Sequence, residues 1–375
     1  MIYLDWNATA PLREEAFAAM EPYLRESYGN PSSIHAAGRK ARVALDEARD
    51  QVADLIGASE REVVFTSGAT EANNLALLGV ASRMPGAVFC SSPVEHPSVL
   101  EPLKALAARK AIEWRTLPMD ETGTIGALDA VRESALTTVM MANNETGILY
   151  PVADIAAAAH EAGGLFHSDV TQAVGRVPVD VTGMAFDMAS LSAHKIGGPK
   201  GVGAFFIRKG VILDKVLHGG RQERSRRPGT ENVAAIVGFG AAAQAALRDV
   251  EANARRMATL RERLWHGLQQ MPMDVECNTP WGASVPNTLH VSFAQVDGNF
   301  LLQRLDMMGL CVSSGSACAS GSPEPSPVLT AMGLTGDRVR GAMRFSLGYA
   351  STEADVDETL RILHRCLDGM KSRAS

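Results

Sequence analysis

Short apolar runs alternate with longer stretches of helical character between residues 62 and 208. The runs are rich in β-branched and aromatic residues, which predicts strands, and the stretches between them carry apolar residues at helical spacing. The expected strands are 63–66, 87–90, 137–141, 164–167, 187–191 and 202–207, and the expected helices are 71–78 and 153–162. Strands that alternate with helices form a mostly parallel sheet with helices on both faces, so the pattern predicts an α/β domain.

The pattern changes in the last third of the chain. One long helical stretch covers 231–269 and carries mixed charges in its middle. After it, a strand over 288–293 precedes a helix over 300–308, and a strand over 343–347 precedes a helix that begins near residue 352. This predicts a second, smaller α+β domain. We place the boundary inside the long helix, so that the large domain covers 15–255 and the small domain covers 1–14 and 256–375.

The composition is that of a globular protein. Of the 375 residues, 46% are hydrophobic and 21% are charged, which excludes a largely disordered chain. There are 36 Lys and Arg residues against 42 Asp and Glu, a net charge of −6, so we do not expect a dedicated nucleic-acid binder. The 5 cysteines are scattered without a Cys-x-x-Cys pair, which disfavours a disulfide framework or zinc ribbon and favours a reducing compartment.

No segment predicts secretion or membrane insertion. The first residues lack a basic stretch followed by an apolar one, as a secretory signal would require. The longest apolar stretch, 233–247, is shorter than the about 20 apolar residues that span a bilayer. We therefore expect a soluble, cytoplasmic protein that binds neither membranes nor nucleic acids.

Three local patterns are candidates for chemistry. The turn 66–71 lies between a strand and a helix, where exposed N–H groups and the helix dipole favour an anion such as phosphate, although a capped turn without a ligand looks the same. Asp169 ends a strand, where α/β sheets bind ligands, and it could pair with a cation or cap the next helix. Lys195 lies between a buried strand and a glycine-rich turn and could form an imine, whereas Lys200 and Lys209 are expected to be ordinary surface lysines.

The three patterns together are more specific than any one of them. Pyridoxal 5′-phosphate requires a lysine that binds it covalently, an acid that keeps its pyridine nitrogen protonated, and a helix N-terminus that holds its phosphate. Lys195 and Asp169 with the turn 66–71 supply these groups. The sequence therefore predicts an enzyme that uses this cofactor.

The chain resembles the cysteine desulfurases of the NifS/IscS type, which belong to the class V group of fold-type I pyridoxal-phosphate enzymes. The matching segments extend over nearly the whole chain: 3–9, 28–33, 65–74, 95–96, 142–147, 169–172, 192–201, 227–232, 312–318 and 344–348. The resemblance implies a large α/β domain with a mostly parallel seven-stranded sheet and a smaller α+β domain. It also implies conversion of L-cysteine to L-alanine, with transfer of the sulfur as a persulfide to an acceptor or iron–sulfur scaffold protein for iron–sulfur cluster assembly.

The resemblance also assigns roles to matching residues. Lys195 would hold the cofactor, Asp169 would pair with the pyridine nitrogen and Gln172 with the ring oxygen, and His96 would stack on the ring and could take part in proton transfer. The substrate carboxylate would be bound by Asn144 and Arg344. The phosphate would be held by Ala69, Thr70, Ser192 and His194, and by Thr230 from the partner subunit of a homodimer.

Cys318 would be the nucleophile that takes the sulfur. It lies in a Ser- and Gly-rich loop, an unusual place for a residue type that is mostly buried, whereas Cys90, Cys277, Cys311 and Cys366 are expected to serve packing, with Cys311 in the core of a strand. No intrinsic metal site is expected, although Cys318 could contact an iron–sulfur cluster or an acceptor transiently. The chain ends at Ser375, soon after its last expected helix, without the longer tail that helps to dock the scaffold protein in the IscS branch.

Each role has a simpler alternative. His96 precedes Pro97 and could only cap a helix, Asn144 could hold a turn, and Arg344 could form an internal ion pair. Another class V activity is also open, an aminotransferase or a selenocysteine lyase, as is a catalytically silent scaffold that binds the cofactor.

Overall fold

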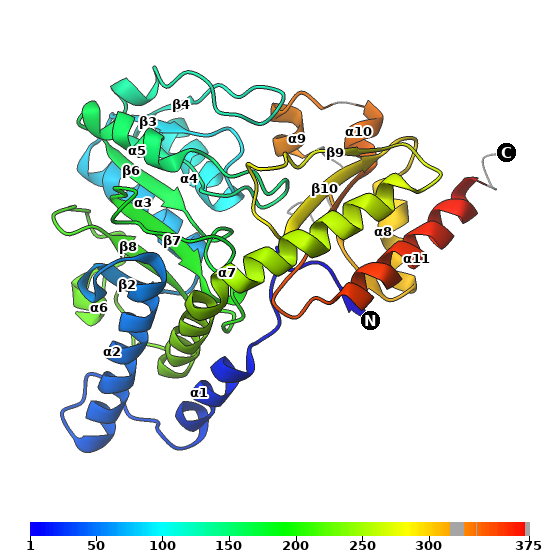
Figure 1. Cartoon of the computed structure of the whole chain (residues 1–375). Coiled ribbons are helices and arrows are strands. Elements are labelled where there is room, and N and C mark those ends of the chain that lie inside the picture. Colours follow the sequence, from blue (N-terminus) through cyan, green and yellow to red (C-terminus); the bar gives the residue numbers. More distant parts are fainter. Residues whose placement is uncertain (316–325, 335, 372–375) are drawn as a thin grey trace.

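The structure is a computed structural model that describes residues 1–315, 326–334 and 336–371 (Figure 1). Its largest element is a seven-stranded sheet in which only β8 is antiparallel to its neighbours. In spatial order the strands are β2 (Val63–Thr66), β8 (Gly203–Ile207), β7 (Met188–Ser192), β6 (Leu165–Asp169), β5 (Leu136–Thr138), β3 (Val88–Ser91) and β4 (Glu113–Thr116). The predicted α/β class with a mostly parallel sheet is confirmed.

Helices cover both faces of this sheet because its side chains alternate between two apolar cores. On β8, Phe205 packs into one buried cluster while Ala204 and Phe206 pack into the other. One face is covered by α3 (Ala69–Arg83) and α4 (Pro97–Ala108), and the other by α2 (Ala36–Ile56), α5 (Val152–Glu161) and part of α7 (Val233–Gln269). Strands β6 to β8 are therefore almost entirely buried.

Helix α7 runs from one apolar core to the other (Figure 1). Its first part packs against α2 and α1 (Glu14–Arg25), and its last part contributes Met257, Leu260, Leu264 and Leu268 to the second core. By length and composition alone, α7 is long and apolar enough to cross a membrane, with a mean hydropathy of 1.3 over its most apolar 18 residues, which the apolar run 233–247 did not indicate. Because 56% of that stretch is buried inside the protein, this is also the signal of a core helix.

The second core lies around a four-stranded antiparallel sheet, β12 (Ser313–Ser314), β13 (Ala342–Ser346), β10 (Thr288–Phe293) and β9 (Val275–Cys277). The N-terminal strand β1 (Ile2–Tyr3) pairs with β11 (Leu310–Cys311), so the start of the chain packs beside its last third. The helices of this region are α8 (Gly298–Met307), α9 (Pro327–Ala331), α10 (Gly336–Arg340) and α11 (Glu353–Lys371). Short elements elsewhere are η1 (Glu60–Glu62), η2 (Val131–Glu133), η3 (Ala193–Lys195) and α6 (Gln222–Ser225).

One expected strand is shorter than the apolar run that predicted it. The run 137–141 predicts a strand, but β5 ends at Thr138. Beyond it, the N–H groups of Val139 and Met141 still donate to β6, at 3.1 Å to His167 O and 3.0 Å to Asp169 O. On the side of β3, however, the N–H of Met140 donates to the side chain of Glu95 at 2.8 Å. A side chain therefore replaces the strand partner on one side only, which hydrophobicity alone does not reveal.

Candidate active site

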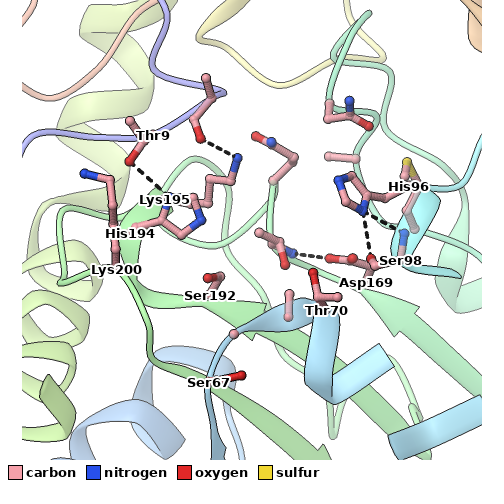
Figure 2. Close-up of a pocket in the computed structure, with 18 of the residues that line it drawn as sticks. Thr9, Ser67, Thr70, His96, Ser98, Asp169, Ser192, His194, Lys195 and Lys200 are labelled. Carbon is pink, nitrogen blue, oxygen red and sulfur yellow. Dashed lines mark hydrogen bonds between the residues drawn. The ribbon is translucent and has the colours of Figure 1, made fainter. Parts of the chain in front are cut away.

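A cavity of about 480 Å³ lies where β6 and β7 end and α3 and α4 begin (Figure 2). Its walls combine polar side chains from these elements with residues of the N-terminal segment. Nine residues that the resemblance assigned to cofactor or substrate line it: Ala69, Thr70, His96, Asn144, Asp169, Gln172, Ser192, His194 and Lys195. The other lining residues are Ala8, Thr9, Ser67, Gly68, Ser98, Met140, Ala142, Thr171, Lys200 and Gly201.

Lys195 reaches the cavity because strand β7 ends at Ser192 and the short turn η3 follows it. Its Nζ donates to the carbonyl oxygens of Asn7 at 2.5 Å and Ala8 at 2.9 Å. Figure 2 shows Lys195 on the opposite side of the cavity from Asp169 and His96. The amine and the carboxylate are thus separated by the space that a ligand would fill.

Asp169 lies at the end of β6 and is 7% exposed. Its Oδ2 accepts from Asn73 Nδ2 at 2.8 Å, and its Oδ1 accepts from the N–H of Thr171 at 3.0 Å. A turn over 171–176 follows β6 instead of a helix, so the alternative that Asp169 caps a helix is wrong. The bond from Thr171 fixes this turn, and Asp169 also lines the cavity.

His96 caps a helix, as the simpler alternative predicted, and it also lines the cavity. It is the N-cap of α4, where its Nδ1 accepts from the N–H of Ser98 at 3.1 Å and lies 2.7 Å from the Ser98 hydroxyl. Burial lowers the pKa of His96, with Asp169 opposing and Lys195 adding to the shift. Because Nδ1 accepts a backbone N–H, the neutral ring carries its proton on Nε2.

The turn before α3 has the features of an anion site. The N-cap residue of α3 is Gly68, and no side chain of an N-cap residue accepts from the first N–H groups of the helix. These N–H groups can therefore bind an anion. Ser192 and His194 line the same cavity. Burial, with the charges of Lys195, Lys200 and Arg176, lowers the pKa of His194 to about 4, so His194 is a neutral hydrogen-bonding group at neutral pH.

Gln172 is oriented by its neighbours. Its Oε1 accepts from Arg176 and its Nε2 donates to the carbonyl of Asn7 at 3.0 Å. Arg176 also donates to the backbone carbonyl of Gln172 at 2.7 Å. The amide of Gln172 consequently presents its NH₂ group, not its oxygen, toward the N-terminal segment at the cavity.

Arg344 lies beside the cavity rather than in its lining. Its Nη1 donates to the carbonyl of Asn144 at 2.7 Å and its Nη2 to Asp5 Oδ1 at 2.7 Å, so it forms the ion pair considered from the sequence. Its Nε is buried and has no hydrogen-bond partner within the described residues. A buried donor of this kind suits a carboxylate, which a guanidinium binds in a bidentate manner.

Besides Arg344, one described residue with an assigned role does not line the cavity of this chain. Thr230 is exposed and does not line it, and its proposed place is in a partner subunit. Cys318 lies outside the described residues. Of the other cysteines, Cys90 and Cys366 are buried, whereas Cys277 and Cys311 are only half-buried, so Cys311 lies in a strand as expected but not at its core.

The sequence patterns missed the residues that support the site. Asn73, Ser98 and Arg176 hold the assigned side chains, and Asp5 pairs with Arg344. Asn73 and Asp5 belong to segments that carried the resemblance, so a signal was present for them. Among the described residues no group of three or more His, Cys, Asp or Glu could hold a metal ion.

The residues fit pyridoxal 5′-phosphate. Lys195 provides an amine, Asp169 a carboxylate fixed by two hydrogen bonds, and the uncapped start of α3 an anion site, all around one cavity.

Comparison with known proteins agrees with this arrangement. The model of the family "Aminotransferase class-V" matches residues 2–359. The chain is 42% identical to a protein named cysteine desulfurase IscS from Dictyoglomus turgidum, over 99% of this chain and 95% of that one. It is 43% identical to a cysteine desulfurase from Cereibacter sphaeroides, over 99% and 97% of the two chains. A solved structure named NifS-like protein is 36% identical, covers 98% of this chain and 99% of its own, and has a TM-score of 0.91.

Proposed function

The chain belongs to the class-V aminotransferase family, and from this premise we propose that it is a pyridoxal-phosphate-dependent cysteine desulfurase. The enzyme converts L-cysteine to L-alanine and takes the sulfur as a persulfide on Cys318. One observation carries the proposal: Lys195, Asp169 and His96 line a single cavity in a chain that matches enzymes of this name over nearly its full length. Intact groups of this kind disfavour a silent scaffold.

The cofactor would be held by Lys195 through its amine and by Asp169 at the pyridine nitrogen, with Gln172 at the ring oxygen and His96 on the ring face. The phosphate would lie at the start of α3, within reach of Thr70 and Ser192. When bound, the cofactor supplies an electron sink for the charge that develops at the α-carbon of the substrate.

Lys195 is the residue that removes the proton from the α-carbon of the substrate. The Nδ1 atom of His96 accepts a backbone N–H, and its pKa is lowered by burial, so the neutral ring presents an N–H rather than a lone pair at Nε2. The resemblance places two nitrogen groups of the cavity wall at the reacting centre, those of His96 and Lys195. The amine of Lys195 is the one of the two that can act as the base. His96 then acts as a hydrogen-bond donor in this state, and Lys195 holds and returns the proton.

Arg344 and Asn144 would bind the carboxylate of L-cysteine. The buried Nε of Arg344 provides a donor without a partner in the described chain, and Asp5 and the carbonyl of Asn144 keep the guanidinium in place. This orientation fixes the amino acid by its carboxylate and leaves its thiol for reaction.

The sulfur step balances without a further reagent. The thiolate of Cys318 attacks the substrate sulfur, an S–S bond forms, the C–S bond breaks, and its electron pair remains on the substrate carbon, which is then protonated. L-Cysteine and one thiol give L-alanine and one persulfide. An acceptor protein, for which we propose an iron–sulfur scaffold, removes the sulfur afterwards.

We also propose a homodimer in which Thr230 reaches the phosphate of the partner subunit. Thr230 is exposed in this chain, and its neighbour Arg227 pairs with Glu71 in the turn at the cavity, Nε to Oε1 at 2.8 Å. The loop that carries Thr230 is therefore attached to the rim of one site with Thr230 itself still accessible. This supports an arrangement in which the Thr230 loop of each subunit completes the site of its partner.

The decisive test compares Cys318→Ala with Cys277→Ala in the holoenzyme. Cys318→Ala should keep the absorbance of the bound cofactor and bind L-cysteine, because Lys195 and Asp169 are intact, but it should lose alanine formation. Cys277→Ala, whose half-buried thiol donates to the carbonyl of Thr279, should turn over at the parent rate. Alanine is measured with L-cysteine as substrate, and mass spectrometry locates the added sulfur.

Parent-rate alanine formation by Cys318→Ala would contradict the proposal and favour another class V activity. A parent protein that binds the cofactor but makes no alanine would instead favour the silent scaffold.

A further inference from the structure

The segment that carries Cys318 is flanked on both sides by described residues that make hydrogen bonds. It follows Gly315, whose N–H donates to the carbonyl of Ala342 at 2.8 Å, and it ends at Ser326. At the first end, Ser313 donates its hydroxyl to Asp5 Oδ1 at 2.8 Å and accepts from Arg344 Nη2 at 3.1 Å. This end is thus attached to the guanidinium proposed to bind the substrate carboxylate.

The second end is held by Glu145. Ser326 is 1% exposed and donates to Glu145 Oε2 at 2.5 Å. The same hydroxyl oxygen is the N-cap of α9, where it accepts from the N–H groups of Val328 at 3.1 Å and Leu329 at 3.2 Å. The Ser326 hydroxyl therefore both donates and accepts hydrogen bonds, and Glu145 accepts the one that it donates.

Glu145 itself is rigidly placed. It is 4% exposed and lies in a turn in which Asn143 Oδ1 accepts from the N–H groups of Glu145 and Thr146, each at 2.9 Å. The preceding residue, Asn144, gives its carbonyl to Arg344 at 2.7 Å. One turn thus contacts the carboxylate-binding arginine through its backbone and the end of the Cys318 segment through its side chain.

We propose that Glu145 is a positioning residue for sulfur transfer: through Ser326 it fixes the end of the Cys318 segment relative to Arg344. This inference rests on the proposed function and adds to it a residue that touches neither substrate nor cofactor. Asp5 and Ser313 fix the other end to the same arginine. Arg344 therefore sets the position of the substrate and, through its two neighbours, the positions of both ends of the segment that attacks it.

The contact depends on the charge of Glu145. Burial raises the pKa of Glu145 to about 7, while the Ser326 hydrogen bond and the charge of Arg344 lower it. Among the described residues, the buried hydroxyl of Tyr150 is the other titratable group that interacts with it. A hydroxyl binds a carboxylate more strongly than a neutral carboxyl group, so the Ser326 contact should strengthen as the pH rises through 7.

The test uses Glu145→Ala and Glu145→Gln in the holoenzyme, with Asp297→Ala as the control. Asp297 caps α8 as Ser326 caps α9, accepting from Asn299 N at 2.9 Å and Phe300 N at 3.0 Å, but within the described residues no hydrogen bond joins it to a residue that lines the cavity. The readouts are the single-turnover rate of persulfide formation on Cys318 and, separately, the affinity for L-cysteine measured from the cofactor absorbance.

Glu145→Ala should slow persulfide formation about tenfold, the scale of one hydrogen bond to a charged group, with L-cysteine affinity changed less than about twofold. Asp297→Ala should keep the parent rate. In Glu145→Gln the amide oxygen still accepts from Ser326, but the side chain does not ionise. The persulfide-forming rate of the parent divided by that of Glu145→Gln should therefore rise severalfold between about pH 6 and pH 8.

Parent-rate persulfide formation by Glu145→Ala, or a constant ratio of parent to Glu145→Gln across this pH range, would overturn the inference alone. Equal losses in Glu145→Ala and Asp297→Ala would also overturn it, because they would show a general effect on stability. A parent enzyme that forms no alanine would overturn the proposed function and this inference together.

Discussion

Glu95, directly before His96, is fully buried next to the cavity. Its Oε1 accepts from the Ser92 hydroxyl at 2.5 Å and from Met140 N at 2.8 Å, whereas Oε2 has no hydrogen-bond partner in the described part of the chain. Burial raises the pKa of Glu95 to about 8 against the effect of these two hydrogen bonds, and the charge of Asp169 adds to the rise. Glu95 is therefore protonated at neutral pH, and its unpaired oxygen is that of a carboxyl group rather than a carboxylate.

This protonation makes stability depend on pH. The folded state binds the proton more tightly than the unfolded state, so the stabilisation is complete below the unfolded pKa of 4.5 and is lost as the pH rises through about 8. We expect the contribution of Glu95 to the free energy of unfolding to fall by on the order of a few kcal/mol between pH 5 and pH 8, measured with urea as the difference between the parent and Glu95→Gln.

Glu95→Gln should flatten this dependence, because the amide does not ionise. Glu101→Gln is the control, since Glu101 is exposed and pairs only with Lys104 at 2.7 Å. Parallel pH profiles for the parent and Glu95→Gln would show that Glu95 is not the group responsible.

At the scale of elements, a buried ion pair joins helix α2 to the turn α6. Arg49 Nη1 donates to Glu223 Oε2 at 2.7 Å and Nη2 to Oε1 at 2.8 Å, and Phe65 N donates to the same carboxylate at 2.9 Å. The backbone φ angles of Glu223, Arg224 and Ser225 are 45°, 55° and 65°, values that residues other than glycine rarely adopt. The ion pair therefore holds a strained turn in the loop that leads to Thr230.

Arg49→Ala should destabilise the protein by about 3–5 kcal/mol, because Glu223 would remain buried without its cation. Arg42→Ala, on the same helix, removes an exposed pair with Asp46 at 4.0 Å and should cost less than about 1 kcal/mol. Denaturant midpoints of the two variants measure the difference. Equal midpoints would mean that the buried pair does not support the turn.

At the scale of the whole molecule, the arrangement of Lys195 and Thr230 distinguishes a shared site from a separate one. If Thr230 acts in the partner subunit, mixing inactive Lys195→Ala with inactive Thr230→Ala chains should restore about a quarter of the parent activity. Half of the dimers are then mixed, and one of their two sites has both intact residues. If Thr230 acts within its own subunit, no mixed dimer has an intact site.

The experiment needs subunit exchange, which sedimentation and tagged chains can verify before activity is measured. Each variant alone is the control for residual activity. A fully active monomer at micromolar concentration, or no recovery after verified exchange, would contradict the shared site.

The sequence alone determined the α/β class and much of the site chemistry. The strands β2 and β10 have the predicted bounds, 63–66 and 288–293, because each is a continuous buried run that needs no knowledge of its partner. Lys195 and Asp169 were found for a similar reason: Asp169 ends β6 and Lys195 lies in the turn directly after β7, and strand ends gather at one edge of a parallel sheet. Local burial and position along the chain were sufficient for these features.

Other elements had weaker local signals. We did not predict α4, which contains Pro97 and Pro102, or the edge strand β4, whose residues are only partly buried. Helix α2 was also missed, although Leu45, Val52 and Ile56 have helical spacing, because alanine and charged residues separate them. Such elements are stabilised mainly by what they pack against, which local periodicity does not contain.

Only the tertiary structure decided which groups meet across the chain. Arg344 pairs with Asp5, 339 positions away, and Lys195 donates to the carbonyl of Asn7, 188 positions away. Both contacts arise because the N-terminal segment packs between the two apolar cores, with β1 paired to β11. A buried cation or amine requires a partner, but the identity of that partner depends on which backbone folds against it. The sequence therefore predicted the reacting groups, and packing selected the residues that hold them in place.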